Sequence, residues 1–222
     1  MTVTAHSVPA PLLTAEEIEP WRKVPVAVAV DLVPGEQIDP AIRPLNPPGK
    51  QPPLFGLAVT ALCEPPDFGA VLHALECAGP GDVLMIAAGG NAQFAMIGEI
   101  LSGHLRNRGC AGVVCDGAVR DVATLAAWTD FSVFSRWVTP RGPTGAVRGQ
   151  VNLPVTIGGR LVSPGDLVIG DDDGLAALSP ATVRARIRDA EAKLALEADW
   201  IAGLASGRSV IETFGLSPAK RG

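Results

Sequence analysis

The sequence predicts a layered α/β domain, and three features of the chain support this fold class. Two short apolar segments, residues 83–88 and 112–115, each precede a segment with helical signals, which is the order of a βα unit. Beyond residue 150, short β-rich segments alternate with turns that contain glycine or proline. Ser179 followed by Pro180 then marks the start of a closing helix. We therefore expect a sheet covered by helices, with a β-rich layer beside it.

The individual elements follow from apolar periodicity and from the positions of Gly and Pro. Strands are expected over residues 54–63, 83–88, 112–115, 151–157, 161–162, 167–169 and 175–178. Helices are expected over residues 14–23, 73–78 and 180–202, and after residue 121. A further amphipathic helix is expected after Asn91, with Phe94, Ile97, Leu101 and Leu105 at helical spacing and Gly109 as its stop.

The chain is expected to contain one main domain with two flanking segments. Residues 1–53 hold a loose arm (1–13), a short helix opened by a Thr14–Glu17 capping box, and a surface connection rich in Pro and Gly. Residues 54–205 form the domain expected to carry the chemistry, and residues 206–222 form a C-terminal tail. A length of 222 residues is sufficient for one domain with a sizeable core.

The composition excludes several classes of protein. Hydrophobic residues make up 47% of the chain and charged residues 18%, with a net charge of −5. A net negative charge argues against binding to nucleic acid, and no apolar run near the start is long enough to be a signal sequence or a membrane span. No membrane association is therefore expected. The four cysteines form no CxxC pair, so we expect reduced thiols and a cytoplasmic location. The low charge also favours burial of surface in an oligomer.

Several common catalytic motifs are missing from the sequence. It contains no dinucleotide-binding GxGxxG, no Walker A lysine, no GxSxG elbow and no HExxH zinc motif. The four lysines all lie outside residues 51–192, so a Schiff-base mechanism is not expected. The lack of a glycine-rich nucleotide loop also argues against a methyltransferase.

A carboxylate and an arginine stand at the most informative position of the chain. Arg120 and Asp121 follow a buried strand and precede a helix, and ligands of α/β sheets collect at the carboxyl ends of strands. Arginine can bind a carboxylate through two parallel hydrogen bonds, and an aspartate offers the hard oxygen that Mg²⁺ prefers. The alternative is structural: Asp121 caps its own helix and Arg120 pairs with a surface acid.

A second element with functional potential follows the preceding strand. Gly89-Gly90 permits close approach of a ligand to the backbone, and amides at a helix N-terminus bind anions. If the helix begins near Ala95, the free amides around residues 99–101 face a ligand; if Asn91 is the N-cap, they lie mid-helix. Glu99 is a candidate general acid or base, or a residue that holds metal-bound water; the alternative is a solvated helix residue.

These segments resemble the RraA-like proteins, a family that includes 4-hydroxy-4-methyl-2-oxoglutarate aldolases which also decarboxylate oxaloacetate. The resemblance rests on residues 95–100 (Ala-Met-Ile-Gly-Glu-Ile), residues 109–121 ending in Asp-Gly-Ala-Val-Arg-Asp, and the turns at 158–159, 164–166 and 171–174. It covers about residues 54 to 180 clearly. The sequence departs from the family pattern at Ile97, where a bulky aromatic residue is frequent, and at Ala87-Ala88, where many members have an acid.

The resemblance implies a β/β/α swivelling-type domain, assembled as a homotrimer or a hexamer, with the site at a subunit interface. It implies that Asp121 binds Mg²⁺ or Mn²⁺, that Arg120 binds the substrate carboxylate, and that Glu99 lies near metal-bound water. Further implied substrate-binding groups are Gly98 and the amides of Ile100 and Leu101. A further acidic metal-site residue would come from the neighbouring subunit, with Glu197 as the first candidate and Glu191 as the second.

The function implied is that of a metal-dependent lyase that cleaves a 4-hydroxy-2-oxo acid to pyruvate and decarboxylates oxaloacetate through the same enolate. The alternative is a non-catalytic RraA-like regulator that binds a ribonuclease or another protein partner, because one fold can serve enzymes and regulators alike. The presence of Asp121 and Glu99, together with a candidate acid from a second subunit, favours the enzyme. The sequence leaves open which oxo acid is used and whether the assembly is a trimer or a hexamer.

Overall fold

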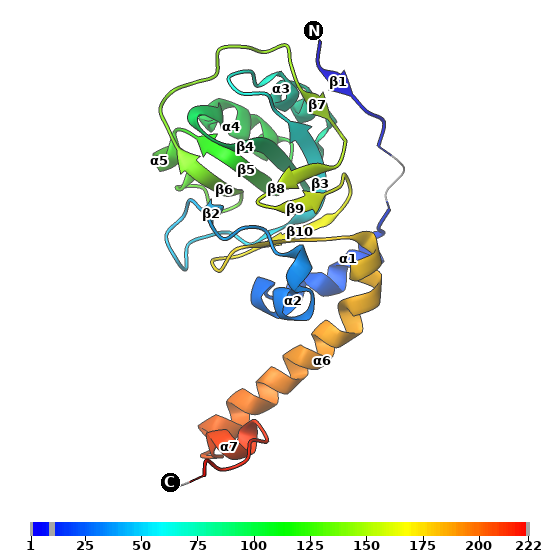
Figure 1. Ribbon diagram of the computed structural model, residues 1–222, viewed down its shortest axis with the longest axis vertical. Coiled ribbons are helices and arrows are strands. Elements are labelled where there is room, and N and C mark those ends of the chain that lie inside the picture. The colour runs from blue at the N-terminus through cyan, green and yellow to red at the C-terminus, as the bar shows by residue number, and fades with distance from the viewer. Residues whose placement is uncertain (1, 9–11, 221–222) are drawn as a thin grey trace.

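The computed structural model describes residues 2–8 and 12–220 and has the predicted α/β class (Figure 1). Within these residues a nine-stranded sheet has the order β1-β7-β3-β4-β5-β6-β2, with β10 paired to β3 and β11 paired to β10. Its strands are β1 (Thr4–Ala5), β2 (Arg43–Pro44), β3 (Leu54–Leu62), β4 (Asp82–Ile97), β5 (Gly112–Val119), β6 (Ser132–Val138), β7 (Gln150–Val151), β10 (Leu167–Gly170) and β11 (Leu175–Leu178). A separate hairpin pairs β8 (Val155–Ile157) with β9 (Arg160–Val162).

The centre of the sheet consists of β3, β4, β5 and β6, which run parallel to one another. Every residue of β5 is buried, as expected for a strand of a parallel sheet covered on both faces. Two predicted boundaries were wrong: β5 continues through Asp116-Gly117, and β4 continues beyond Gly89-Gly90 to Ile97, with shifts in its register against β5. Strand β6 was not predicted.

The described residues contain both α-helices and 3₁₀ turns, and some of them cover the sheet (Figure 1). The α-helices are α1 (Ala15–Ile18), α2 (Val26–Leu32), α3 (Gly69–Cys77), α4 (Glu99–Asn107), α5 (Val122–Leu125), α6 (Pro180–Ala205) and α7 (Val210–Thr213), with 3₁₀ turns η1 (Glu19–Lys23) and η2 (Pro34–Glu36). One apolar core contains side chains of α3, α4 and α5 against one face of the sheet. A second core lies on the other face, under the β8–β9 hairpin, and a third joins α2 and α6 to β10 and β11.

The N-terminal region is more ordered than predicted. The capping box of Thr14 and Glu17 is confirmed at the start of α1. The expected loose arm includes residues 1 and 9–11, which lie outside the described residues, but Thr4–Ala5 form a strand that pairs with β7. Within the expected surface connection, Ile38 and Ile42 are each 1% exposed and belong to the second core.

The C-terminal helix leaves the body of the molecule (Figure 1). Helix α6 begins after the N-cap Ser179 with Pro180 at its first position, as predicted. Its second half projects away from the sheet, and the segment with α7 folds back on it, where the rings of Trp200 and Phe214 lie 4.8 Å apart. Exposed apolar side chains are frequent on this projecting part; they include Leu196, Ile201, Leu204, Val210, Ile211, Phe214 and Leu216.

The cysteines and the hydropathy of the helices in the described part of the chain bear on two further expectations. All four cysteines are free thiols, as predicted, and three of them are buried. Burial raises the pKa of the Cys63 thiol to about 12, so this thiol is protonated at neutral pH. In residues 2–8 and 12–220, none of the helices combines the length and the hydropathy needed to span a bilayer.

Candidate functional site

The N-terminus of α4 forms one half of the candidate site. The amphipathic helix that ends before Gly109 was predicted to begin near Asn91 or Ala95. This start is wrong, because residues 91–97 belong to β4. The helix begins at Glu99, with Gly98 as its N-cap. The first intrahelical hydrogen bond runs from the backbone amide of Ser102 to the Gly98 carbonyl, over 3.0 Å. The amides of Glu99, Ile100 and Leu101 therefore belong to the first turn, where backbone N–H groups have no partner within the helix. Such amides, with the helix dipole behind them, favour an anion.

Asp121 forms the other half, directly after β5. Its backbone is left-handed, with φ 58° and ψ 34°, and its side chain makes no capping bond to α5. Instead the Asp121 carboxylate accepts a hydrogen bond from the Glu99 amide, with Oδ2 and N 3.0 Å apart. Asp121 thus occupies the N-cap position of α5, as the structural alternative expects, but its side chain does not cap that helix. The carboxylate joins two elements separated by 22 positions in the chain.

Gly98 permits this close approach. A Cβ at position 98 would clash with Oδ2 of Asp121 and would lie 2.8 Å from Cγ of Arg120. The φ of Gly98 is −154°, an extended value open to any residue, so the need for glycine here is purely steric. The Arg120 amide also donates to the Ile97 carbonyl at 3.1 Å. These contacts hold Arg120 and Asp121 directly against the start of α4.

Arg120 lies beside Asp121 with its side chain 43% exposed. Its Nε is 3.6 Å from Asp121 Oδ2, so the arginine does not pair with a remote surface acid. A pocket of about 40 Å³ opens at this point. Its walls combine the predicted groups with apolar neighbours: Phe68, Ala95, Met96, Ile97, Gly98, Ile100, Leu101, Arg120, Asp121 and Pro143. Guanidinium, carboxylate and first-turn amides thus converge on one small cavity.

A larger pocket, of about 260 Å³, lies where β3 begins, whereas the pocket at Arg120 and Asp121 lies where β4 and β5 end. Two of its charged side chains already have partners: Asp171 accepts a hydrogen bond from the Val26 amide, and the Arg22 guanidinium lies 4.2 Å from the centre of the Phe55 ring. We therefore place the candidate site at the smaller pocket.

Of the predicted site residues, the structure brings six together and keeps two elsewhere. Glu99 is exposed at the start of α4, and Ile100 beside it is 80% exposed. Glu197, in contrast, lies on α6 and pairs with Lys193 at 3.1 Å; the same lysine pairs with Asp31 of α2. Glu191 lines a hollow formed with η1 and α1. Within one chain, neither α6 glutamate joins Asp121, as expected if either acts on a neighbouring subunit.

The oxygen donors of the pocket determine whether it fits Mg²⁺ or Mn²⁺. Among the residues that the structure describes, no cluster of three or more His, Cys, Asp or Glu side chains is arranged around a common point. Mg²⁺, however, commonly binds through one or two carboxylates and keeps several waters. Both contacts recorded for the Asp121 carboxylate in the described chain use Oδ2, which leaves Oδ1 as a hard oxygen donor. Asp121 therefore fits such an ion, with its other ligands supplied from outside this chain's described residues.

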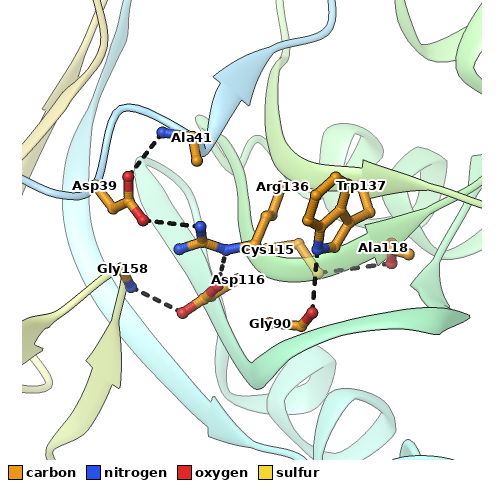
Figure 2. Close-up of polar contacts among 9 residues, drawn as sticks. All are labelled: Asp39, Ala41, Gly90, Cys115, Asp116, Ala118, Arg136, Trp137 and Gly158. Atoms are coloured by element: carbon orange, nitrogen blue, oxygen red, sulfur yellow. Dashed lines mark hydrogen bonds and ion pairs between the residues drawn. The ribbon is translucent and has the colours of Figure 1, made fainter.

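Asp116, the first residue of the Asp-Gly-Ala-Val-Arg-Asp block, has a structural role instead (Figure 2). Its Oδ1 is 2.6 Å from Nε of Arg136, and its Oδ2 accepts the Gly158 amide at 2.8 Å. Nη1 of Arg136 in turn lies 2.8 Å from Oδ2 of Asp39. This network faces the β8–β9 hairpin and ties β5 and β6 to it. It leaves Arg120 and Asp121 as the residues of the block that reach the pocket.

The sequence prediction missed the wall opposite α4. The loop of residues 139–148, between β6 and β7, brings Gly142 and Pro143 to Arg120. Phe68, from the segment before α3, completes the pocket lining. These residues carry no motif, and only their tertiary contacts identify them.

The chain is similar to proteins of known family. A family model described as RraA-like, Aldolase/RraA, matches residues 27–176. The chain belongs to the RraA-like family. Among its RraA-like relatives, a protein of Halalkalibacterium halodurans named "Putative 4-hydroxy-4-methyl-2-oxoglutarate aldolase" is 34% identical over 162 residues, covering 72% of this chain and 75% of the relative.

Solved structures share the RraA-like fold. An uncharacterized protein from Pseudomonas syringae pv. tomato superposes with a TM-score of 0.80 at 21% identity, covering 93% of this chain and 100% of the other. The RNA-processing inhibitor RraA from Thermus thermophilis superposes with a TM-score of 0.63 at 28% identity, covering 70% of this chain and 93% of the other. RraA-like proteins thus include both proteins named as aldolases and one named as an inhibitor.

Proposed function

We propose that this RraA-like chain is a divalent-metal-dependent lyase that cleaves a 4-hydroxy-2-oxo acid to pyruvate and decarboxylates oxaloacetate. The observation that carries the proposal is the hydrogen bond from the Glu99 amide to the Asp121 carboxylate, next to Arg120 in the same pocket. It places a hard oxygen ligand, a carboxylate-binding guanidinium and anion-binding amides within reach of one small substrate. The aldolase name of the 34% identical relative supports the same reaction class.

Each protein group has a defined task in this reaction. Arg120 binds the 1-carboxylate of the 2-oxo acid through its guanidinium, and the amides of Ile100 and Leu101 donate to the same anion. Mg²⁺ or Mn²⁺, held by Asp121, polarises the keto group when bound. Ile100, whose side chain is exposed, and Pro143 line the pocket in which the substrate would bind.

The bond changes balance without any further cofactor. The general base, for which Glu99 is the candidate, takes the 4-hydroxyl proton; C4 then becomes a carbonyl as the C3–C4 bond breaks, and the electron pair passes to C3 and the keto oxygen as the enolate of pyruvate. Arg120 stabilises this negative charge, and a proton delivered from water near Glu99 to C3 gives pyruvate. Oxaloacetate loses CO₂ to form the same enolate, so both activities belong to one site.

The proposed assembly is a homotrimer or a hexamer in which α6 reaches a neighbouring subunit. Support comes from the second half of α6, which projects from the body with exposed apolar side chains (Figure 1). Such side chains are stabilised by burial against another surface, at about 25 cal/mol per Å² of apolar area. Glu197 on this helix is the proposed acid for the neighbour's metal site, with Glu191 as the second candidate.

The proposal is tested by measuring pyruvate release from oxaloacetate and from 4-hydroxy-4-methyl-2-oxoglutarate with Mg²⁺, with Mn²⁺ and with EDTA. Metal-dependent release from both substrates, above the rate of the metal alone, is expected. Release from oxaloacetate alone would point to a decarboxylase or to an aldolase for another oxo acid. No release above the metal background contradicts the lyase.

A second candidate function is a non-catalytic regulator that binds a ribonuclease or another protein. The observation in its favour is the 28% identity to a protein named as an RNA-processing inhibitor, on the same fold. Inactivity in the pyruvate assay together with saturable, 1:1 binding of a purified endoribonuclease would favour this function. Binding that survives Asp121→Asn would further separate it from the metal site.

A further inference from the structure

The loop of residues 139–148 stands against the guanidinium of Arg120. Thr139 donates its amide to the Val119 carbonyl at 3.0 Å, which holds the start of the loop at the end of β5. The Ala95 amide donates to the Arg141 carbonyl at 2.8 Å, which holds the next residues against β4. The loop therefore crosses the end of the sheet where Arg120 emerges, and Figure 1 shows it passing over the side of the body that carries α3 and α4.

Gly142 is the point of contact. A Cβ at position 142 would lie 2.8 Å from Nη1 of Arg120 and 3.8 Å from its Cζ, and no other group lies within 4 Å. Because Gly142 has no side chain, the guanidinium of Arg120 can lie directly beside its backbone. No left-handed backbone requires glycine here, since the φ of Gly142 lies outside the positive range. Pro143, the next residue, lines the substrate pocket.

The far end of the loop is held by one buried carboxylate. Asp67, 5% exposed, accepts hydrogen bonds from the amides of Val147 at 3.0 Å and Arg148 at 2.9 Å, as well as from Gly69 at 2.8 Å. Two backbone bonds reinforce the attachment: Thr144 donates to the Pro66 carbonyl, and Phe68 donates to the Gly145 carbonyl, each at 2.9 Å. A carboxylate that accepts several backbone N–H groups makes strong, charge-assisted bonds.

We propose that Asp67 and Gly142 are positioning residues for Arg120: Asp67 holds the 139–148 loop in place, and Gly142 within that loop fixes where the guanidinium lies in the pocket. The inference rests on the proposed function for the role of Arg120 as the carboxylate-binding group. It extends that function by naming residues that control the affinity for the 2-oxo acid without touching the substrate. Displacement of a substrate-binding group by about 1 Å can cost up to about 100-fold in rate or binding.

The kinetic test compares Gly142→Ala with wild type and repeats the comparison in an Arg120→Lys background. Gly142→Ala is expected to raise KM for oxaloacetate about 10-fold, because a displaced Arg120 binds the carboxylate less tightly, and also to lower kcat, because Arg120 stabilises the enolate. In the Arg120→Lys background, which has no Nη1 to displace, the same substitution is expected to change KM less than about 2-fold. An equal effect in both backgrounds overturns the role of Gly142.

The test of Asp67 needs no substrate, so it stands even if the proposed function fails. Asp67→Asn is expected to speed trypsin cleavage after Arg141 and Arg148 at least about 5-fold, because an uncharged amide holds the loop less tightly. The matched control is Asp166→Asn: Asp166 is also buried and accepts a backbone amide, that of Ser163 at 2.8 Å, but in the turn before β10. Equal cleavage in wild type, Asp67→Asn and the control overturns the role of Asp67.

Crystal structures of wild type and Gly142→Ala separate failure of the inference from failure of the proposed function. A guanidinium displaced by more than about 1 Å supports the positioning role whether or not pyruvate is released. An unmoved guanidinium contradicts it, even if the wild type proves to be an active lyase.

Discussion

The backbone amide of Glu99 donates a hydrogen bond to the carboxylate of Asp121, with the two atoms 3.0 Å apart. This bond joins the first turn of α4 to a residue just after β5. It therefore holds the proposed metal ligand next to the proposed anion-binding amides. A carboxylate is favoured at a helix N-terminus by the dipole and by the unpaired N–H groups there. The same carboxylate therefore serves both the fold and the proposed chemistry, and a substitution must separate the two roles.

Asp121→Asn separates them. Asparagine tolerates the left-handed backbone of position 121 and keeps an oxygen that accepts the Glu99 amide, while it removes the negative charge. We expect metal-dependent pyruvate release to fall at least about 100-fold, with a change in Tm below about 4 °C. Asp189→Asn on α6, which removes the ion pair with Arg186, is the matched surface control and is expected to retain full activity. Wild-type turnover by Asp121→Asn would rule out Asp121 as the metal ligand.

Gly98→Ala tests the close packing of Gly98 against Arg120 and Asp121. The added Cβ meets Oδ2 of Asp121 and Cγ of Arg120, so both side chains must shift. We expect kcat/KM to fall at least about 30-fold and Tm to fall by several degrees, as for an overpacked site. Gly35→Ala is the control, because nothing lies within 4 Å of its added Cβ and its φ is not in the left-handed range. If both alanine variants have wild-type kcat/KM, the close approach at Gly98 has no part in activity.

Two of the strands predicted from the apolar pattern are buried by neighbours on both faces. Residues 83–88 and 112–115 are apolar throughout, because they form the centre of a parallel sheet. Strand β6 escaped prediction because Ser132 and Arg136 interrupt its apolar pattern. Their polar groups are satisfied by residues far away in the chain: the Ser132 hydroxyl donates to the Pro52 carbonyl at 2.7 Å, and Arg136 pairs with Asp116.

Residues 91–98 illustrate a failure of periodicity. Phe94, Ile97 and Leu101 are spaced three and four apart, as in a helix, but Ala95 and Ile97 pair with residues of β5 instead. Tertiary pairing thus overrides the local pattern. For the site, the position after a buried strand indicated Arg120 and Asp121, whereas Glu99 gained weight only from the resemblance to a family. Gly142 could not be found from sequence, because the loop that carries it is attached to Asp67, which lies 80 positions before Val147 in the chain.

Two buried aspartates predict opposite effects of pH on stability. Desolvation acts to raise the pKa of Asp67, but amides of Val147, Gly69 and Arg148 outweigh it and hold the pKa below its ordinary value of 3.8. At Asp166 desolvation dominates and raises the pKa. A lowered pKa stabilises the fold above about pH 3.8, and this stabilisation is lost as the pH falls through the folded-state pKa. A raised pKa contributes stability below about pH 3.8 that is lost as the pH rises through the folded-state value.

The measurement is Tm against pH for wild type, Asp67→Asn and Asp166→Asn. The advantage of wild type over Asp67→Asn is expected to shrink as the pH falls below about 4. Relative to Asp166→Asn, wild type is expected to lose stability as the pH rises from about 3 to about 6. Parallel curves for all three proteins would show that neither carboxyl group changes its pKa on folding.

The proposed contribution of Glu197 to a neighbouring subunit predicts complementation between two inactive variants. Asp121→Asn lacks the metal ligand of its own subunit, and Glu197→Gln lacks the acid donated to the next subunit. When the two chains are co-expressed with different tags in equal amounts, half of the subunits carry Asp121 and half of their neighbours carry Glu197. In every mixed trimer one of the three sites is then complete, so a doubly tagged trimer is expected to regain about a third of wild-type activity, and a doubly tagged hexamer about a quarter.

The fold of each variant should survive, because Lys193 keeps its pair with Asp31 when Glu197 is replaced, and an exposed i,i+4 pair contributes only about 0.3–0.5 kcal/mol. Glu191→Gln provides the parallel experiment for the second candidate. If Glu197→Gln is active alone and Glu191→Gln is complemented, Glu191 is the donated acid. If both glutamine variants are fully active alone, neither Glu197 nor Glu191 is donated to a neighbouring site, and the proposed role of these two glutamates is wrong.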